Sequence, residues 1–134
     1  MTTHVYLLHK IIVSVLMLVM IAGCNNDESD TVTAYLEQMT EVAVIIENAR
    51  GQEGASEAAD QILKKRSNIN DLVGKIRSKP EPEKSKLLQQ YGDRINAINQ
   101  RIIAALTAQA MRDADARRII SDAIMRLERL YVDG

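Results

Sequence analysis

Apolar residues recur every three or four positions along most of the chain after residue 30. This spacing places them on one face of an α-helix, which turns once in 3.6 residues, so it predicts helices rather than strands. The first predicted helix begins near Asp30, whose carboxylate suits an N-cap, and ends near Arg50, before Gly51. Its inner face is expected to consist of Val32, Tyr35, Met39, Val42, Ile46 and Ala49. Residues 51–54 are predicted to form a turn.

A second helix is predicted from about Ala55 to Arg77. Its inner face is expected to consist of Ala55, Ala59, Ile62, Arg66, Ile69, Val73 and Ile76. Because Arg66 is charged, we expect its aliphatic stem to pack on the bundle while its guanidinium group reaches a carboxylate or water. Residues 78–82 are predicted to form a loop, because a proline disfavours the α conformation in the residue before it.

A third helix is predicted to start at about Pro82, with the inner face Leu88, Tyr91, Ile95, Ile98, Ile102 and Ala105. The same spacing then reaches Gln109 and Arg112, whereas the apolar residues continue in a new phase as Ala116, Ile120, Ala123, Leu127 and Leu130. A single helix through both phases would be about 75 Å long, too long for a compact domain of this size. We therefore predict a break, with Asp113 or Asp115 capping a fourth helix.

Four helices joined by short connections predict an all-α fold. Its architecture is expected to be an antiparallel (up-down-up-down) four-helix bundle of residues 30–134, after a helical N-terminal signal segment. The core must be aliphatic, since the sequence contains no Phe or Trp.

The first 24 residues have the pattern of an export signal. Residues 11–22 form an apolar run of twelve, which covers about 18 Å as a helix and is too short for a bilayer core of about 30 Å. The sequence Ile21-Ala22-Gly23-Cys24 that ends this segment resembles the lipobox of bacterial lipoproteins. The resemblance implies that residues 1–23 are a cleaved signal peptide, that Cys24 carries lipid, and that residues 24–29 are a lipidated tether. The alternatives are a secretory signal with an accidental cysteine and a short membrane anchor.

Charge is distributed unevenly between the two halves of the expected mature chain. Residues 24–60 hold nine acidic residues and one basic residue, Arg50, whereas residues 61–134 hold nine acidic and fifteen basic residues. One interpretation is an acidic helix packed beside basic ones. The other is a basic face turned toward anionic lipids or an acidic partner.

The candidate chemistry is limited because both histidines, His4 and His9, precede Cys24. Zinc sites and Cys–His or Ser–His nucleophiles are therefore not expected in the mature domain, and nothing in the sequence indicates a nucleic-acid partner. The order and lengths of the helices resemble the soluble b-type cytochromes of the bacterial periplasm, in which a Met and a His hold haem. Met39 matches the first ligand, but the last helix has no His, and Met125 is more simply a core residue. We therefore expect no cofactor and no metal.

These observations predict a membrane-tethered envelope lipoprotein that acts as a non-enzymatic protein-binding or accessory module, of the secretion, inhibitor, exclusion or immunity type. The alternative is a carrier of a small ligand or cofactor inside the bundle. Asn25 follows the cysteine, where Asp favours inner-membrane retention in the lipoproteins that the chain resembles. The expected location is therefore the periplasmic face of the outer membrane, ahead of the inner membrane or the cell surface.

A candidate partner surface lies on the first predicted helix. Val44 falls about 200° round the helix from Val42 of its inner face, so it is expected to point away from the core. Ile103, on the outer side of the third helix, is the residue expected to extend such a surface. Either a protein partner or a second copy of the chain could occupy it.

Overall fold

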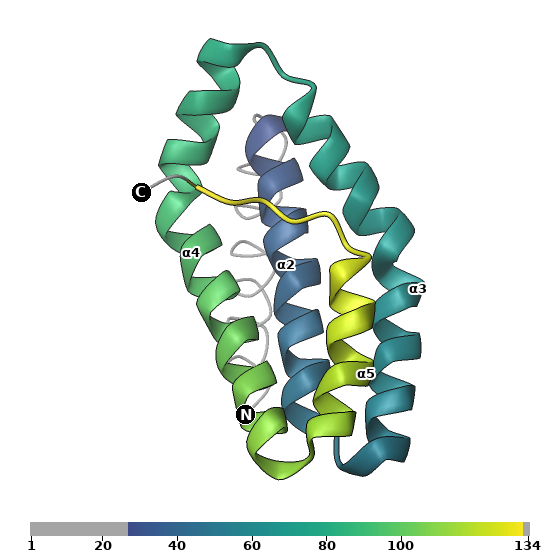
Figure 1. The fold of residues 1–134 in the computed structure, drawn as a ribbon. Helices are drawn as coiled ribbons and strands as arrows, with labels where there is room; N and C mark the ends of the chain where they lie inside the picture. Colours follow the sequence, from purple (N-terminus) through teal and green to yellow (C-terminus); the bar gives the residue numbers. More distant parts are fainter. Residues whose placement is uncertain (1–26, 133–134) are drawn as a thin grey trace, which may run out of the picture.

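The computed structural model describes residues 27–132, which form four helices in sequence: α2 (Asp27–Asn48), α3 (Gly51–Arg77), α4 (Glu81–Arg112) and α5 (Ala114–Met125). The helices run alternately down and up (Figure 1), and the described part of the chain contains no strand. The predicted all-α four-helix bundle is therefore confirmed. The predicted signal segment and Cys24 lie outside the described residues.

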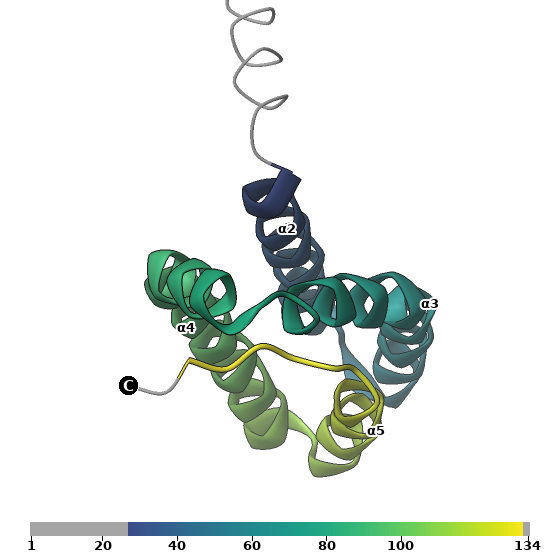
Figure 2. The same cartoon turned by 90° about the horizontal axis from the view of Figure 1, so that it is seen from above.

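Each helix packs against two neighbours. Helices α3 and α4 both lie against α2 on one side and α5 on the other, so α2 and α5 occupy opposite corners, as the view from above shows (Figure 2). The fourth corner is filled only in part by a helix, because α5 has 12 residues and α4 has 32. This difference in length leaves one end of the bundle for a non-helical segment to cover.

The core is mainly aliphatic, with Tyr35 as its one fully buried aromatic ring among the described residues. All six predicted inner-face residues of α2 are buried, and Ile62, Ile69, Val73 and Ile76 of α3 are fully enclosed. Burial of a single large aliphatic side chain is worth about 1.5–3 kcal/mol. The interior of the bundle is therefore held mainly by the hydrophobic effect.

The connection between α2 and α3 is shorter than predicted. Residues 51–54 are the first turn of α3 and not a turn, and α2 begins at Asp27, within the predicted tether. Only Ala49 and Arg50 lie between the helices. The reversal is this tight because Gly51 has a φ of +69°, a left-handed conformation that a residue without a Cβ adopts easily.

The predicted register of the second helix is wrong at one position. Arg66 is exposed, whereas Leu63 and Lys65 are the half-buried residues between Ile62 and Ile69. Lys65 turns toward α2, where its Nζ is paired with the carboxylate of Glu41 and lies 3.4 Å from Oε1 of Gln38. The physical reason is the cost of removing a charge from water. The ammonium group of Lys65 stays near water in its ion pair at the rim of the bundle, whereas a buried guanidinium group of Arg66 would not.

The start of the third helix is also shifted from the prediction. Leu87 is buried, whereas Leu88 and Tyr91 are only partly buried against the core. From Ile95 to Ala105 the predicted inner face is confirmed. The early turns of α4 lie beyond the end of α5, and Gly92 there packs against Val132 instead of against a fourth helix.

The predicted break between the third and fourth helices is confirmed at Asp113. Its backbone is extended, and Oδ1 accepts hydrogen bonds from the backbone N–H groups of Asp115 and Ala116 at 3.0 and 3.1 Å. Such an N-cap satisfies donors that the first turn of a helix leaves unpaired. The fourth helix ends at Met125 and is shorter than predicted, although Leu127 and Leu130 are buried as expected.

Candidate functional site

Residues 126–132, here called the C-terminal strap, cross the end of the bundle that α5 leaves open. The strap leaves the end of α5, passes in front of α2 and reaches α4 (Figures 1 and 2). Leu127 and Leu130 are buried in the core. Val132 packs beside Gly92 of α4, where an added Cβ would lie 3.4 Å from a methyl carbon of Val132. The strap therefore takes the place of the missing half of the fourth helix.

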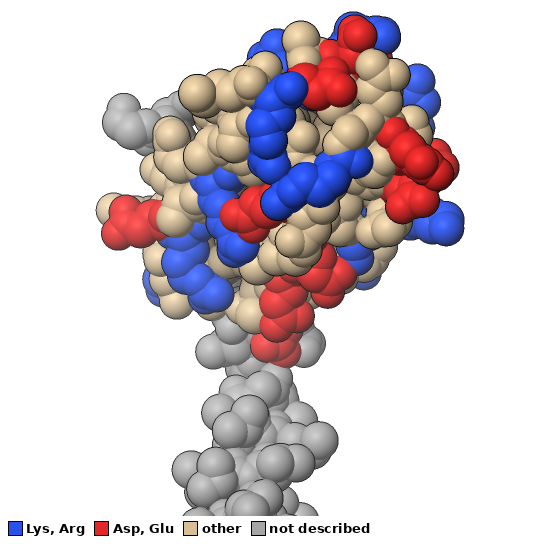
Figure 3. Space-filling model, turned by 90° about the horizontal axis from the view of Figure 1, so that it is seen from below, with Lys and Arg blue, Asp and Glu red and all other residues tan. Residues whose placement is uncertain are grey.

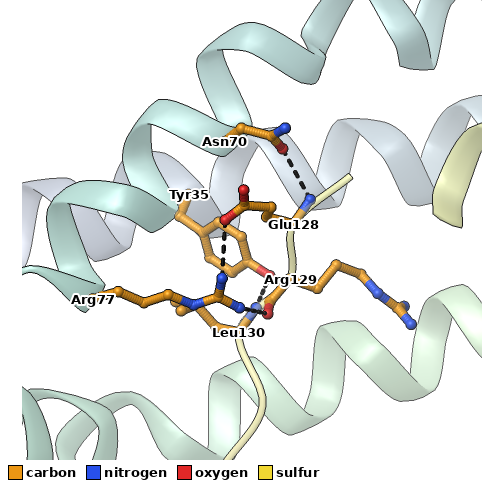
Figure 4. A network of polar contacts seen from close by, with 6 residues as sticks. All are labelled: Tyr35, Asn70, Arg77, Glu128, Arg129 and Leu130. Atoms are coloured by element: carbon orange, nitrogen blue, oxygen red, sulfur yellow. Dashed lines mark hydrogen bonds and ion pairs between the residues drawn. The ribbon is translucent and has the colours of Figure 1, made fainter. Parts of the chain in front are cut away.

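Polar side chains from α2 and α3 hold the backbone of the strap (Figure 4). Tyr35 Oη accepts a hydrogen bond from the N–H of Leu130 at 2.9 Å, and Asn70 Oδ1 accepts one from the N–H of Glu128 at 2.9 Å. Arg77 donates to the Glu128 carboxylate at 2.9 Å and to the carbonyl oxygen of Arg129 at 3.2 Å. These bonds satisfy backbone groups that helical hydrogen bonds would otherwise satisfy. They explain why the last helix stops although no Gly or Pro follows before Gly134.

Asn99 of α4 completes this network from the opposite side. Its Nδ2 donates to the carbonyl oxygen of Leu130 at 3.0 Å, so both polar backbone groups of Leu130 are bonded by side chains. The Asn99 Oδ1 is buried and has no hydrogen-bond partner among residues 27–132. Burial raises the pKa of the Tyr35 hydroxyl above its ordinary value, which keeps that group neutral. The network consists of neutral groups inside and one ion pair, Arg77–Glu128, at the surface.

The candidate partner residue Val44 lines a groove between α2 and α3, here called the α2–α3 groove. It has a volume of about 500 Å³, is open to solvent, and is lined by Val44, Ile45 and Ala58 together with Arg50 and Glu57. The side chain of Val44 is 40% exposed. The groove lies at the end of the bundle opposite the strap, because it includes the last turn of α2 and the first turn of α3 (Figure 1).

The second candidate, Ile103, is 51% exposed but belongs to a different surface. Arg101 on the same helix points toward α2, where it bonds the Glu47 carboxylate at 2.6 and 3.2 Å. Ile103 is two residues farther along, about 200° round the helix, and therefore points away from α2. Val44 and Ile103 do not form one patch.

The other residues considered for chemistry are not brought together. Met39 is fully buried on α2. The interpretation of Met125 as a core residue is wrong, because it is 74% exposed at the last position of α5. No group of three or more His, Cys, Asp or Glu side chains within residues 27–132 is arranged to hold a metal ion. In the same range, no helix is long and apolar enough to cross a membrane.

The acidic helix α2 lies beside basic residues of its neighbours. Glu41 pairs with Lys65 of α3, and Glu47 pairs with Arg101 of α4. At the end of the bundle seen from below, basic and acidic side chains are interspersed (Figure 3). This distribution agrees with the first interpretation of the charge asymmetry, an acidic helix packed against basic ones. Each such surface pair is worth only about 0–1 kcal/mol.

Several residues with structural roles were missed from the sequence. Gln109 is buried, and its Nε2 donates to the carbonyl oxygens of Ile46 and Ala49 at 2.8 and 2.9 Å. The sequence contained one signal for it, because the apolar spacing of the third helix leads directly to position 109. Asn99 and Asn70 gave no such signal, since their partners lie 31 and 58 residues away.

Comparison with known proteins gives no family for this chain: no protein-family model matches it, and no significant similarity to a curated protein or a solved structure is found. Its function must be argued from its own residues.

Proposed function

We propose that the protein is a lipoprotein whose helical bundle is held at a membrane surface by lipid on Cys24, and that it acts by binding other envelope proteins rather than by catalysis. The observation that carries the anchoring is the sequence Ile21-Ala22-Gly23-Cys24 after twelve apolar residues. Buried acyl chains contribute about 0.8 kcal/mol per CH₂, and two or more chains anchor a protein stably. The proposed location is the periplasmic face of the outer membrane.

The position of α2 supports a close attachment. The helix begins at Asp27, three residues after Cys24, and three residues span at most about 11 Å. The lipid would thus hold the bundle by the end at which α2 starts, where the strap and the α3–α4 connection also lie (Figure 1). The opposite end, with the α2–α3 groove, would face away from the membrane toward a partner.

The polar groups of the bundle favour a binding module over an enzyme. Each of the polar side chains Tyr35, Asn70, Asn99 and Gln109 bonds the backbone of the protein itself. Each of these contacts fixes a helix end or the strap, and each therefore serves the scaffold. Recognition would then depend on the surface, where the open groove beside Val44 offers apolar contact between charged residues.

The alternative, a carrier of a small ligand in the bundle interior, has less support. Carriers of this type need a cavity along the bundle axis, typically of about 300 Å³ or more. The axis of this bundle is occupied by fully buried side chains, among them Met39, Ile62 and Ile102. A ligand would have to displace them, which costs several kcal/mol for close-packed aliphatic groups.

The anchoring is tested by the substitution Cys24→Ser in the full-length chain. We expect loss of label from radioactive palmitate and release of the protein from the membrane fraction, because the acyl chains need the thiol. Asn25→Ser is the matched control, since it changes the adjacent residue and leaves the thiol in place. Equal labelling of the Cys24→Ser variant and the wild type would refute the lipoprotein assignment.

A further inference from the structure

Helix α4 has a second face without charge, opposite the face that it contributes to the core. Residues 102–111 (IIAALTAQAM) contain no charged side chain, and Arg101 and Arg112 flank them. Ile102, Ala105 and Gln109 point into the bundle. The exposed residues of the run are Ile103, Ala104, Thr107, Ala108, Ala110 and Met111. The two largest of them are strongly exposed, Ile103 at 51% and Met111 at 85%.

The exposed residues repeat with the spacing of a helix-pairing face. From Ile103 and Ala104 the pattern moves to Thr107 and then to Ala110 and Met111, in steps of three and four residues. This is the spacing by which two helices pack along a common seam. A helix that is apolar on both sides is normally covered on both sides, and the bundle covers only the inner side of α4. We call this outer side, Ile103 to Met111, the α4 outer face.

The pattern of the α4 outer face is symmetric about Thr107. Four residues before it stands the large Ile103 and four after it the large Met111, while three residues on either side stand Ala104 and Ala110. Seen along the helix, Ile103 and Ala110 therefore lie on one side of Thr107, and Ala104 and Met111 lie on the other side. Each side carries one large and one small side chain. A two-fold axis beside Thr107 places a large side chain of one copy against an alanine of the other. Such self-complementarity is what a two-fold symmetric contact between identical chains requires.

From these observations we infer that the α4 outer face binds a second copy of this chain, with Thr107 at the two-fold axis. The lack of charge fits this partner, because any charged residue at the centre would face its own like charge. The face spans little more than two helical turns. The area that it can bury is therefore smaller than the area of about 800 Å² per partner that stable complexes bury. The dimer is therefore weak in dilute solution and forms at high local concentration. The inference depends only on α4 and not on the anchor at Cys24.

Disulfide trapping tests this contact in the full-length chain, in which Cys24 is the only native cysteine. Thr107→Cys places a thiol beside the two-fold axis, where it meets its own copy whether the paired helices run in the same or opposite directions. Ser67→Cys is the matched control, because Ser67 is an exposed hydroxyl residue in the middle of α3. The unsubstituted chain measures any background from Cys24. Cells are treated with copper–phenanthroline, and dimer is measured on non-reducing gels in both membrane and soluble fractions, so that a failure of anchoring does not hide the contact.

We expect the Thr107→Cys chain to form covalent dimer at least tenfold faster than the Ser67→Cys chain. Adding Ile103→Glu to Thr107→Cys should lower the rate to that of the control, with unchanged helicity by circular dichroism, because Ile103 is exposed and its replacement does not disturb the core. Equal rates for Thr107→Cys and Ser67→Cys would overturn the inference. A Thr107→Cys rate that Ile103→Glu leaves unchanged would overturn it as well, since dimerisation would then not involve this face.

Discussion

Two buried amide side chains make contacts that no apolar residue could supply. Gln109 donates to the carbonyl oxygens of Ile46 and Ala49 at the end of α2. These oxygens also accept from the N–H of Ala49 and from the guanidinium group of Arg50. Asn99 bonds the carbonyl oxygen of Leu130 in the strap. Each amide lies within an otherwise apolar face of α4, and each joins that helix to a segment far away in the sequence. Single residues of α4 thus fix both ends of the bundle.

Gln109→Leu should destabilise the protein by about 1–2 kcal/mol, because it removes two hydrogen bonds from partly buried carbonyl groups and fills the space with a side chain that cannot replace them. Gln100→Leu is the control, since it makes the same change at an exposed position of the same helix. Urea unfolding followed by circular dichroism measures both. A loss in Gln109→Leu no larger than in Gln100→Leu would show that the cap does not contribute to stability.

Among the elements, the C-terminal strap depends most on tertiary contacts. Its side chains Leu127 and Leu130 supply apolar burial, while Tyr35, Asn70, Arg77 and Asn99 supply the hydrogen bonds. The residues of the strap continue the helical spacing of α5, and a longer helix would bury the same leucines. The extended form is found because it reaches across to α4, whose first turns would otherwise lack a neighbour on that side.

Tyr35→Phe tests how firmly the strap is held. Loss of the hydroxyl leaves the N–H of Leu130 without its acceptor, and we expect a destabilisation of about 1–2 kcal/mol at pH 8. Tyr91→Phe removes the same group from a partly buried ring on α4 and serves as the control. Hydrogen exchange of the Leu130 amide should quicken in Tyr35→Phe alone. Unchanged exchange would mean that the hydroxyl does not hold the strap.

The stabilities of the wild type and of Tyr35→Phe should also respond differently to alkaline pH. Burial raises the pKa of Tyr35 in the folded state above its ordinary value of 10.0, so the folded protein keeps this proton when the unfolded chain has lost it. Stability is then independent of the group below pH 10 and falls as the pH rises above it. The advantage of the wild type over Tyr35→Phe in urea unfolding should therefore shrink as the pH rises above 10.0, the ordinary pKa of the hydroxyl. A constant difference would contradict the raised pKa.

For the molecule as a whole, the two ends of the bundle are built differently. The end at which α2 begins is closed by the strap, and the other end carries the α2–α3 groove and the cap made by Asp113. Charges are paired across helices at the rim and interspersed on the surface. Stability therefore comes from the aliphatic core and the strap, and the groove beside Val44 contributes little to it.

Val44→Glu should separate stability from partner binding. Because Val44 is 40% exposed beside an open groove, we expect the free energy of unfolding to change by less than about 0.5 kcal/mol. Recovery of envelope proteins with the tagged chain should fall if the groove binds them. Ser67→Glu, which adds the same charge on the exposed side of α3, controls for charge alone. Equal recovery with both variants would exclude the groove as the binding surface.

Much of this protein was determined by local patterns that the sequence contains. The three- and four-residue spacing predicted four helices and most of the core, because helix periodicity and burial concern residues within a few turns of one another. The change of phase after Ala105 and the acidic residues near position 113 predicted the break. The lipobox-like sequence before Cys24 likewise needs no neighbour in space to be recognised.

Only the tertiary structure decided which polar residues are buried and where the chain leaves the helix. Arg66 was predicted inside and is exposed, while Gln109 is enclosed and its amide donates to two carbonyl oxygens at the end of α2. The strap is extended because side chains from α2, α3 and α4 bond its backbone. The contacts of Gln109 and of the strap join residues 31 to 95 positions apart. The energy of such a pair is set by distances that exist only once the helices have packed.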